Sequence, residues 1–447
     1  MNLERIINLA ENRGASLSEL FIYSDREVSA SISRGGKISL SSSKSEGIGI
    51  RVIVNGREGF SYTSKLDLNE IEKTISRAIK IAKKSGRKLE TLPKSKDKIP
   101  SVNGFYYEEI KNITEDQVFK FIKEIFDKTL KYNGYGKLIS CRSDFKYIEW
   151  KIINSYGLEY EFHETHNIVS YSALAIKNGA SALNYDYIYD RKIIDLDEAK
   201  EYAIKVIKLA ENGVPETSIK SGIYPVILSP RAFITILNYT LYPILKANFY
   251  PRRLERGSII GSEKLNLIED PLNPLIPRSS PIDHEGTIRR RKIIIEKGEL
   301  KTLLYDHYYA ERENVESTGN GFRTPILTWP RMTKPYQGLP SPEIGSLKII
   351  NSNKSIHDLA NQVNNGLYVI YVIGAHGADP ASGRFSATAP IAFKIENGGI
   401  GKPVKHATIS GDLSQLLNII DVGNEEKLVF NTLSPSVLVS ELKIAGD

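Results

Sequence analysis

The stretch GIGIRVIVNGREGFSYTS, residues 47–64, decides how the N-terminal part of the chain folds. An apolar segment at 48–54 is followed by Asn55-Gly56 and then by a second strand-like segment at 60–62. A type I′ turn needs positive φ at both central positions, so Asn-Gly between two strand patterns predicts a β-hairpin. Directly after it, Asp67 as an N-cap and an apolar stripe predict a helix over 67–85.

The residues around this hairpin complete a first α+β unit. Apolar residues at helical spacing predict a helix over 3–13, which ends at Gly14. Strand patterns follow at 20–23 and 28–32. The segment 84–102 is rich in Lys, Ser and Pro and has few large apolar residues, which is typical of a linker. We therefore place a first domain at 1–90.

Two further units follow in the sequence. A helix at 115–132, strands within 138–176 and a helix at 197–212 predict a middle α+β domain over 105–220. The third unit, 221–447, is predicted to be rich in strands and contains one long amphipathic helix at 230–248, in which Pro243 favours a kink. The predicted fold class is therefore α+β, with N-terminal and middle α+β domains and a strand-rich C-terminal domain.

Composition excludes several classes of protein. Of the 447 residues, 41% are hydrophobic and 25% are charged, which is typical of soluble globular chains and not of collagen-like, disordered or membrane-embedded ones. No apolar run approaches the roughly 18 residues of a membrane span. The first ten residues carry charges within their apolar stretch and lack a small-residue cleavage site, so no signal peptide is predicted. We expect a cytoplasmic protein with no membrane partner.

Cysteine and charge narrow the choice of cofactors and partners. A single cysteine, Cys141, excludes an internal disulfide and a Cys-based zinc or iron–sulfur site. The net charge of +7 is mild for this length, so nucleic acid is a permitted but unlikely partner. The basic run Arg289–Lys292 is flanked by acidic residues and lies in a strand pattern, so we interpret it as a solvated strand face.

The histidines do not form an evident metal site in the sequence. His163-Glu164-Thr165-His166 resembles a metalloprotease motif, but its histidines are three residues apart in a strand-like segment. Such residues point to opposite faces of a strand, so a shared ion is not expected. His376 lies in a small-residue loop after an apolar strand, where backbone amides could approach a ligand. Neither a Walker loop, nor a GxGxxG fingerprint after a strand, nor a GxSxG elbow is present.

Several short motifs occur together in a characteristic order. The hairpin at 47–64 with its following helix comes first. The others are INSYG at 153–157, DHEG at 283–286 with EKGEL at 296–300, ESTGN at 316–320, GRFS at 383–386 with IENG at 395–398, and SGDL at 410–413. This ordered set spans nearly the whole chain and resembles the TldD/PmbA (TldD/TldE) family.

The resemblance implies one of two kinds of subunit. TldD-type members resemble zinc peptidases with a His-Glu-x-x-x-His helix and a late Cys ligand, whereas PmbA/TldE-type members lack these ligands. The corresponding helix here has Asn238, Tyr239 and Pro243 where His, Glu and His would be expected. Residues 429–433 contain no cysteine. The resemblance therefore implies degenerate metal-site positions, no catalytic residue and no cofactor, with zinc expected only in a TldD-type partner.

The function implied by the resemblance is that of a metal-free PmbA/TldE-like subunit of a TldD/TldE-type metalloprotease that processes unfolded or extended peptides. We expect a dimer, with a TldD-type subunit or with itself, formed through the C-terminal half. The candidate peptide-binding loop contains His376, Asp379, Arg384, Phe385 and Ser386. One alternative is a regulatory protein associated with DNA gyrase or nucleic acid. Another is a stand-alone metallopeptidase, which would require His163, His166 or His376 to converge.

Overall fold

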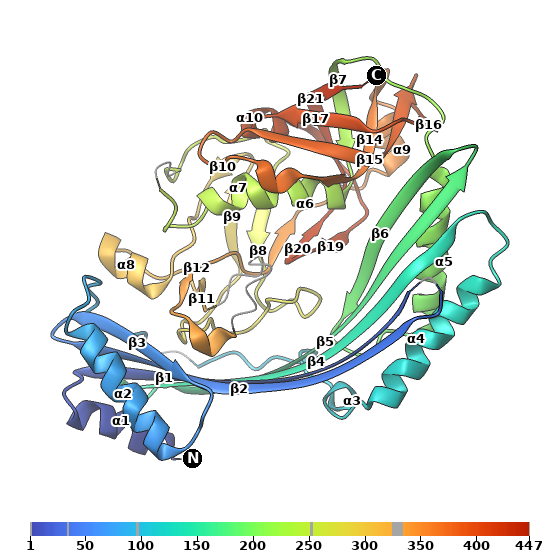
Figure 1. The fold of residues 1–447 in the computed structure, drawn as a ribbon. Coiled ribbons are helices and arrows are strands. Elements are labelled where there is room, and N and C mark those ends of the chain that lie inside the picture. The colour runs from blue at the N-terminus through green and yellow to red at the C-terminus, as the bar shows by residue number, and fades with distance from the viewer. Residues whose placement is uncertain (1, 34, 95–97, 251–253, 324–333, 447) are drawn as a thin grey trace.

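One long antiparallel sheet forms the first part of the molecule (Figure 1). The computed structural model describes residues 2–33, 35–94, 98–250, 254–323 and 334–446. The sheet has the strand order β3-β2-β1-β4-β5-β6, and each strand is antiparallel to its neighbours. Its strands are β1 (Leu17–Ser33), β2 (Ile38–Val54), β3 (Arg57–Thr63), β4 (Lys137–Asn154), β5 (Glu159–Lys177) and β6 (Ala180–Asp190).

The hairpin predicted from residues 47–64 is present. Asn55 and Gly56 join β2 to β3 and have φ angles of 53° and 67°. Positive φ at both positions is what a type I′ turn requires, so the turn expected from the sequence is confirmed.

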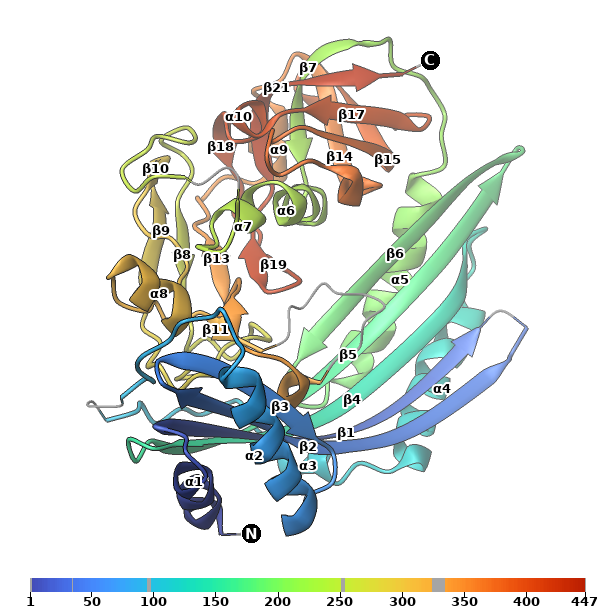
Figure 2. The same cartoon turned by 60° about the vertical axis from the view of Figure 1, so that its left-hand side comes forward.

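Five helices cover the convex side of the sheet, opposite the C-terminal half (Figures 1 and 2). They are α1 (Leu3–Asn12), α2 (Leu68–Ala82), α3 (Glu108–Lys111), α4 (Glu115–Leu130) and α5 (Leu196–Asn212). The predicted N-cap of α2 is confirmed, because Asp67 Oδ1 accepts a hydrogen bond of 3.0 Å from the backbone N–H of Glu70. A Cβ at Gly59 of β3 would lie 2.2 Å from the backbone oxygen of Ala78 in α2, so the absence of a side chain there permits this packing.

The sheet is continuous across the boundary that we predicted between domains 1–90 and 105–220. β1 pairs along its length with β2 on one side and with β4 on the other, so the two predicted domains share one sheet. The domain division itself stays a prediction. The two separate strands predicted at 20–23 and 28–32 are wrong, because the polar residues between them keep ladder partners on both sides and β1 is uninterrupted.

The C-terminal half contains a closed barrel, which lies over the concave face of the long sheet (Figure 2). Five strands close the ring in the order β7-β21-β17-β15-β14 and back to β7, with only the β14–β7 pair parallel. Two more strands attach, β16 (Gly399–Pro403) to β15 and β18 (Ile419–Val422) to β21. The ring strands are β7 (Gly222–Leu228), β14 (Asn365–Ile373), β15 (Phe385–Glu396), β17 (Ala407–Gly411) and β21 (Val437–Ala445).

A second sheet of short strands lies between the barrel and the long sheet, in the order β10-β9-β8-β13-β20-β19 (Figure 2). Its strands are β8 (Leu267–Glu269), β9 (Lys292–Glu296), β10 (Glu299–Leu300), β13 (Leu347–Ile349), β19 (Lys427–Val429) and β20 (Thr432–Ser434). A two-stranded ribbon pairs β11 (Gly321–Phe322) with β12 (Ser341–Pro342). The short helices are α8 (His307–Glu313), α9 (Ile356–Ala360), α10 (Leu413–Leu416), η1 (Pro335–Gln337) and η2 (Ala375–Gly377). The predicted α+β class and strand-rich C-terminal half are confirmed.

The helix predicted over 230–248 is interrupted, and the kink expected at Pro243 takes the form of a break. The structure has α6 (Pro230–Tyr239), a break at Thr240, and a short α7 (Leu241–Ile244). Pro243 lacks the N–H that would bond to the carbonyl of Tyr239, and its ring would clash with that carbonyl in a continuous helix. The break therefore follows from Pro243, four residues after the end of α6.

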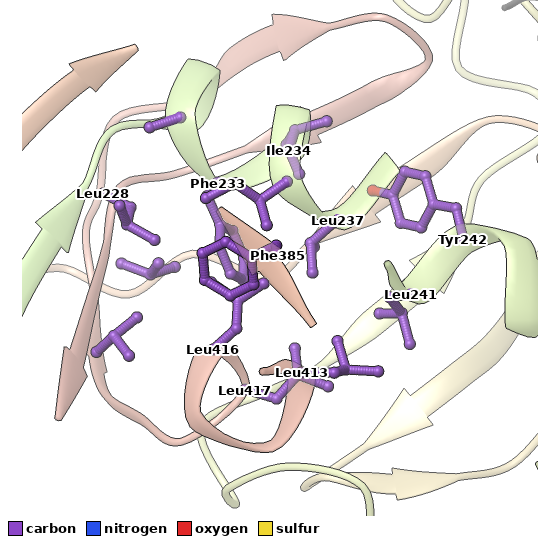
Figure 3. Packing of buried hydrophobic residues seen from close by; sticks show 14 of the residues in the cluster. Leu228, Phe233, Ile234, Leu237, Leu241, Tyr242, Phe385, Leu413, Leu416 and Leu417 are labelled. Atoms are coloured by element: carbon purple, nitrogen blue, oxygen red, sulfur yellow. The ribbon is translucent and has the colours of Figure 1, made fainter. Parts of the chain in front are cut away.

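The largest core cluster surrounds α6 inside the C-terminal half. Figure 3 shows Phe233 and Leu237 of α6 facing Phe385 of β15, with Leu416 of α10 close by. All four side chains are buried. This packing fixes α6, and with it the positions expected for the metal ligands, relative to the barrel.

Candidate functional site

The candidate site forms where α6 ends. Ser229 caps the helix by accepting from the backbone N–H of Ala232 at 3.3 Å, and Pro230 occupies the first helical position, where no donor is needed. The helix then runs to Tyr239 and stops at the break caused by Pro243. The three degenerate positions therefore lie on the last turn of α6 and the first turn of α7.

The structure brings two of the predicted residues together. The ring of Tyr239 meets the imidazole of His376 edge to face, with centroids 6.5 Å apart and planes at 71°. Tyr239 is half-buried and His376 is exposed. Asn238 is 7% exposed, and its side-chain nitrogen has no hydrogen-bond partner within the described part of the chain. The end of α6 and the loop after β14 thus share one surface.

The segment where a late cysteine ligand would be expected also lies beside these helices. The Tyr242 hydroxyl of α7 is 2.9 Å from Thr432 Oγ1, at the start of β20, and both groups are buried. Burial raises the pKa of Tyr242 well above its ordinary range, so this phenol stays neutral. In this segment, where the resemblance would place a cysteine ligand, the side chains include the hydroxyl of Thr432 and the amide of Asn431.

Four of the five residues predicted for peptide binding are exposed. Asp379 shapes their loop, since its carboxylate accepts from the backbone N–H of Ala381 at 3.0 Å and of Ser382 at 3.3 Å. Hydrogen bonding by the Ser382 side chain, followed by that of the Ala381 N–H, lowers the pKa of Asp379. The prediction that Phe385 contacts a peptide is corrected by the structure. Its side chain is 4% exposed and packs into the core, so the ring supports the loop and cannot contact a peptide. The exposed members are His376, Asp379, Arg384 and Ser386.

This donor set does not fit a catalytic zinc. Zinc is held by thiolate, imidazole or carboxylate ligands. The three positions on α6 and α7 supply an amide, a phenol and a proline ring, with one exposed imidazole beside them. In the described ranges, no group of three or more His, Cys, Asp or Glu side chains is placed to hold a metal ion.

His163 and His166 lie in separate surroundings on β5. His163 Nδ1 is 2.8 Å from the Tyr147 hydroxyl, whereas His166 Nδ1 is 3.0 Å from the Tyr189 hydroxyl and its other nitrogen is 3.3 Å from Glu164. Their partners differ because residues three apart on a strand face opposite sides, as predicted. Cys141 is buried in β4, and burial raises the pKa of its thiol.

A buried ionic cluster joins the long sheet to the C-terminal half, and the sequence analysis missed it. Arg51 of β2 lies 2.6 Å from Glu58 of β3 and 2.8 Å from Glu285, and 3.6 Å from Glu19 of β1, with every side chain fully buried. Arg323 pairs with Glu19 from the C-terminal side. The signal was present in the sequence, because Arg51 is the only charged residue inside the apolar strand 48–54.

The basic run at 289–292 is also partly buried. Arg289 is 2.6 Å from Glu269 and Lys292 is 2.5 Å from the same carboxylate, whereas Arg290 and Arg291 are exposed. Interpreting the whole run as a solvated strand face was therefore wrong for two of its four residues. Arg289 precedes β9, which begins at Lys292, so strand alternation does not relate the two side chains; both reach the buried carboxylate of Glu269.

Comparisons with known proteins agree with this architecture. The family model described as PmbA/TldA metallopeptidase C-terminal domain matches residues 221–446, and the one described as PmbA/TldA metallopeptidase domain 1 matches residues 18–82. The chain belongs to the PmbA/TldD family. It is 28% identical to an uncharacterised protein of Methanocaldococcus jannaschii, with 98% of each chain covered.

Two solved structures share the fold of this PmbA/TldD family member. TldE of Thermococcus kodakarensis is 25% identical with a TM-score of 0.84, and 99% of each chain is covered. A Thermotoga maritima protein, whose description proposes it as a modulator of a DNA gyrase, is 24% identical with a TM-score of 0.86 over 99% of each chain. Within the described residues, no helix is long and apolar enough to cross a membrane.

Proposed function

We propose that this chain is the metal-free, PmbA/TldE-like subunit of a TldD/TldE-type metalloprotease system. The observation that carries the proposal is the chemistry at the end of α6. Asn238, Tyr239 and Pro243 occupy the positions of the expected ligands, and none of them offers the imidazole or carboxylate that a catalytic zinc requires. The likeness to TldE over 99% of the chain supports the same assignment.

In this proposal, a TldD-type partner carries the zinc and hydrolyses an unfolded or extended peptide held between the subunits. The present chain contributes peptide contacts rather than a reacting group. The exposed residues of the 376–386 loop can contact the main chain of a bound peptide through an imidazole, a guanidinium and a hydroxyl. They lie beside the half-buried ring of Tyr239. An extended peptide can also pair with an open strand edge, which accepts many sequences because the main chain makes the hydrogen bonds.

The test is a reconstitution with a TldD-type subunit. We expect the purified chain alone to leave an unfolded reporter peptide intact, and the mixed subunits to cleave it. In the mixture, Arg384→Ala combined with Ser386→Ala should raise KM for the peptide with little change in kcat. Lys402→Ala, an exposed substitution on β16, is the matched control and should change neither value. Cleavage by the chain alone, or an unchanged KM in the loop variant, would contradict the proposal.

A further inference from the structure

A cavity of about 370 Å³ lies at the seam between the long sheet and the barrel. On one side are β6 and the end of α5, and on the other are strands of the barrel and the first turn of α6. Figure 1 shows β6 beside the barrel strands. The cavity is at the small end of pockets that bind low-molecular-weight ligands, so it suits a group the size of one large amino-acid residue. It lies at the opposite end of α6 from the degenerate metal-site positions.

Two cations at this seam share one carboxylate. Lys427 Nζ is 2.9 Å from Asp186 of β6, and Arg231 Nη1 is 3.5 Å from the same carboxylate. Arg231 also donates to Asn184 Oδ1 at 3.1 Å and lies over the ring of Tyr371, 4.7 Å from its centroid. These contacts hold the two halves together, and both cations lie on the side of the cavity that Asp186 lines.

Glu425 is different, because it lines the cavity without a cation. Its carboxylate accepts a hydrogen bond from the Ser436 hydroxyl, and no Lys, Arg or His of the described residues lies within 4.0 Å of it. The charge of Glu425 also acts on the neighbouring Tyr368. Burial and then this charge raise the pKa of the Tyr368 phenol to about 12. A carboxylate has about four acceptor sites, so Glu425 retains capacity for a cationic donor.

The remaining walls are mostly apolar and come from both sides of the seam. The ring of Phe393 packs near that of Tyr368, with centroids 6.4 Å apart. The apolar lining residues are Leu209, Pro230, Ile370, Phe393 and Ile400. The site therefore combines an apolar chamber with the Glu425 carboxylate and, apart from it, the ion-paired Asp186, Arg231 and Lys427.

We propose that this seam cavity binds a primary ammonium group attached to an apolar body, such as the free amino terminus of a peptide that begins with an aliphatic or aromatic residue. The ammonium group pairs with Glu425, and the apolar body fills the space against Phe393 and Ile400. Because the cavity belongs to a single chain, binding requires neither the partner subunit nor peptide cleavage. Its failure would thus leave the proposed function untouched.

The test measures binding to the purified full chain by isothermal titration calorimetry. The probes are phenylalanyl-alanine amide, its N-acetyl derivative, phenethylamine and 3-phenylpropionate. We expect the two free amines to bind and N-acetylation to weaken binding by about tenfold or more, as loss of a charged hydrogen bond requires. Tighter binding of the peptide amide than of phenethylamine would identify a peptide terminus as the ligand, and equal binding a simple amine. Equal binding of the acetylated and free peptides, preference for the carboxylate, or no binding at millimolar probe would overturn the proposal.

Two variants with matched controls locate the site. Glu425→Gln keeps an acceptor for Ser436 and should reduce binding of the free amine to the level of the acetylated probe. Glu426→Gln removes an exposed neighbour that pairs with Lys348 at 2.8 Å and should have no effect. Ile400→Trp should fill the chamber and abolish binding, whereas Ile223→Trp, at a position 66% exposed, should not. If Ile400→Trp fails to fold, the near-isosteric Glu425→Gln decides the outcome: unchanged amine binding in that variant would refute the assignment.

Discussion

Removing the guanidinium of Arg51 should loosen the contact between the long sheet and the C-terminal half. In an Arg51→Met variant, Glu19 keeps Arg323 and Glu58 keeps Arg87. Glu285 loses its guanidinium partner at 2.8 Å and keeps the backbone N–H of His307 at 2.7 Å. One buried carboxylate is thus left without compensation. Breaking a buried ion pair in this way costs about 3–5 kcal/mol, so we expect a decrease of that size in the free energy of unfolding.

The pH dependence of the free energy of unfolding provides a second test of this prediction. Burial by itself would raise the pKa of Glu285, but the charge of Arg51, followed by His307, brings the net pKa below its ordinary value. Glu285 therefore stabilises the wild type above its ordinary pKa of about 4.3, and this contribution is lost as pH falls through the lower folded-state pKa. In the variant the pKa is raised instead, so the stability difference should be largest near pH 7 and should shrink toward about pH 5.

Urea unfolding, followed by circular dichroism at several pH values, measures both effects. Arg57→Met is the matched control, because Arg57 is exposed on the adjacent strand, and it should change the free energy by less than about 0.5 kcal/mol. The double variant Arg51→Met with Glu285→Gln should recover part of the loss, since both charges are then absent. A loss below about 1 kcal/mol, equal to that of the control, would refute the reasoning.

Three further outcomes are expected. Burial and then the charge of Glu285 raise the pKa of Asp306, whose Oδ2 is buried without a partner in the described structure. Wild-type stability should therefore fall as pH rises above about 4. Asp306→Asn, which keeps the cap on Tyr309, should be more stable than wild type at pH 9 and equal to it near pH 4 in thermal melts. The triple variant Asn238→His, Tyr239→Glu, Pro243→His should show no zinc-dependent peptide cleavage, because residues 429–433 still lack a thiolate; recovery of cleavage by this variant alone would mean that the rest of the site is intact. Light scattering at micromolar concentration should show a dimer, alone or with a TldD-type subunit, because short strands leave edges that pairing can cover; a monomer in both samples would contradict this.

Local signals in the sequence were sufficient for much of the fold. The Asn55-Gly56 turn and the cap at Asp67 depend on backbone chemistry within a few residues, so the sequence predicted them correctly. The continuity of β1 was not predictable in this way, since its polar centre is held by ladders from β2 and β4, which are distant in sequence. The break before Pro243 agrees with the local effect expected of proline, whereas the apolar stripe alone predicted that the helix continues to residue 248.

In the candidate site too, contacts between residues distant in sequence could not be predicted from local patterns. Proximity of Tyr239 to His376, and of Tyr242 to Thr432, depends on the closure of the barrel and on the position of α6 within it, which no periodicity reveals. Phe385 was placed in the binding loop as part of the GRFS motif at 383–386, yet its side chain is buried in the core at the start of β15. Arg51 required the tertiary structure as well, because its partners lie on β1, β3 and the loop that contains Glu285.

The most direct test of the account is the metal content of the pure protein. The chain should be purified alone and, separately, after co-expression with a TldD-type subunit, then dialysed and analysed for zinc and for cleavage of an unfolded peptide. The account predicts no stoichiometric zinc and no cleavage for the chain alone, and zinc with cleavage only in the complex. One equivalent of tightly held zinc in the chain alone would contradict the central claim, since it would show that the residues around α6 form a metal site after all.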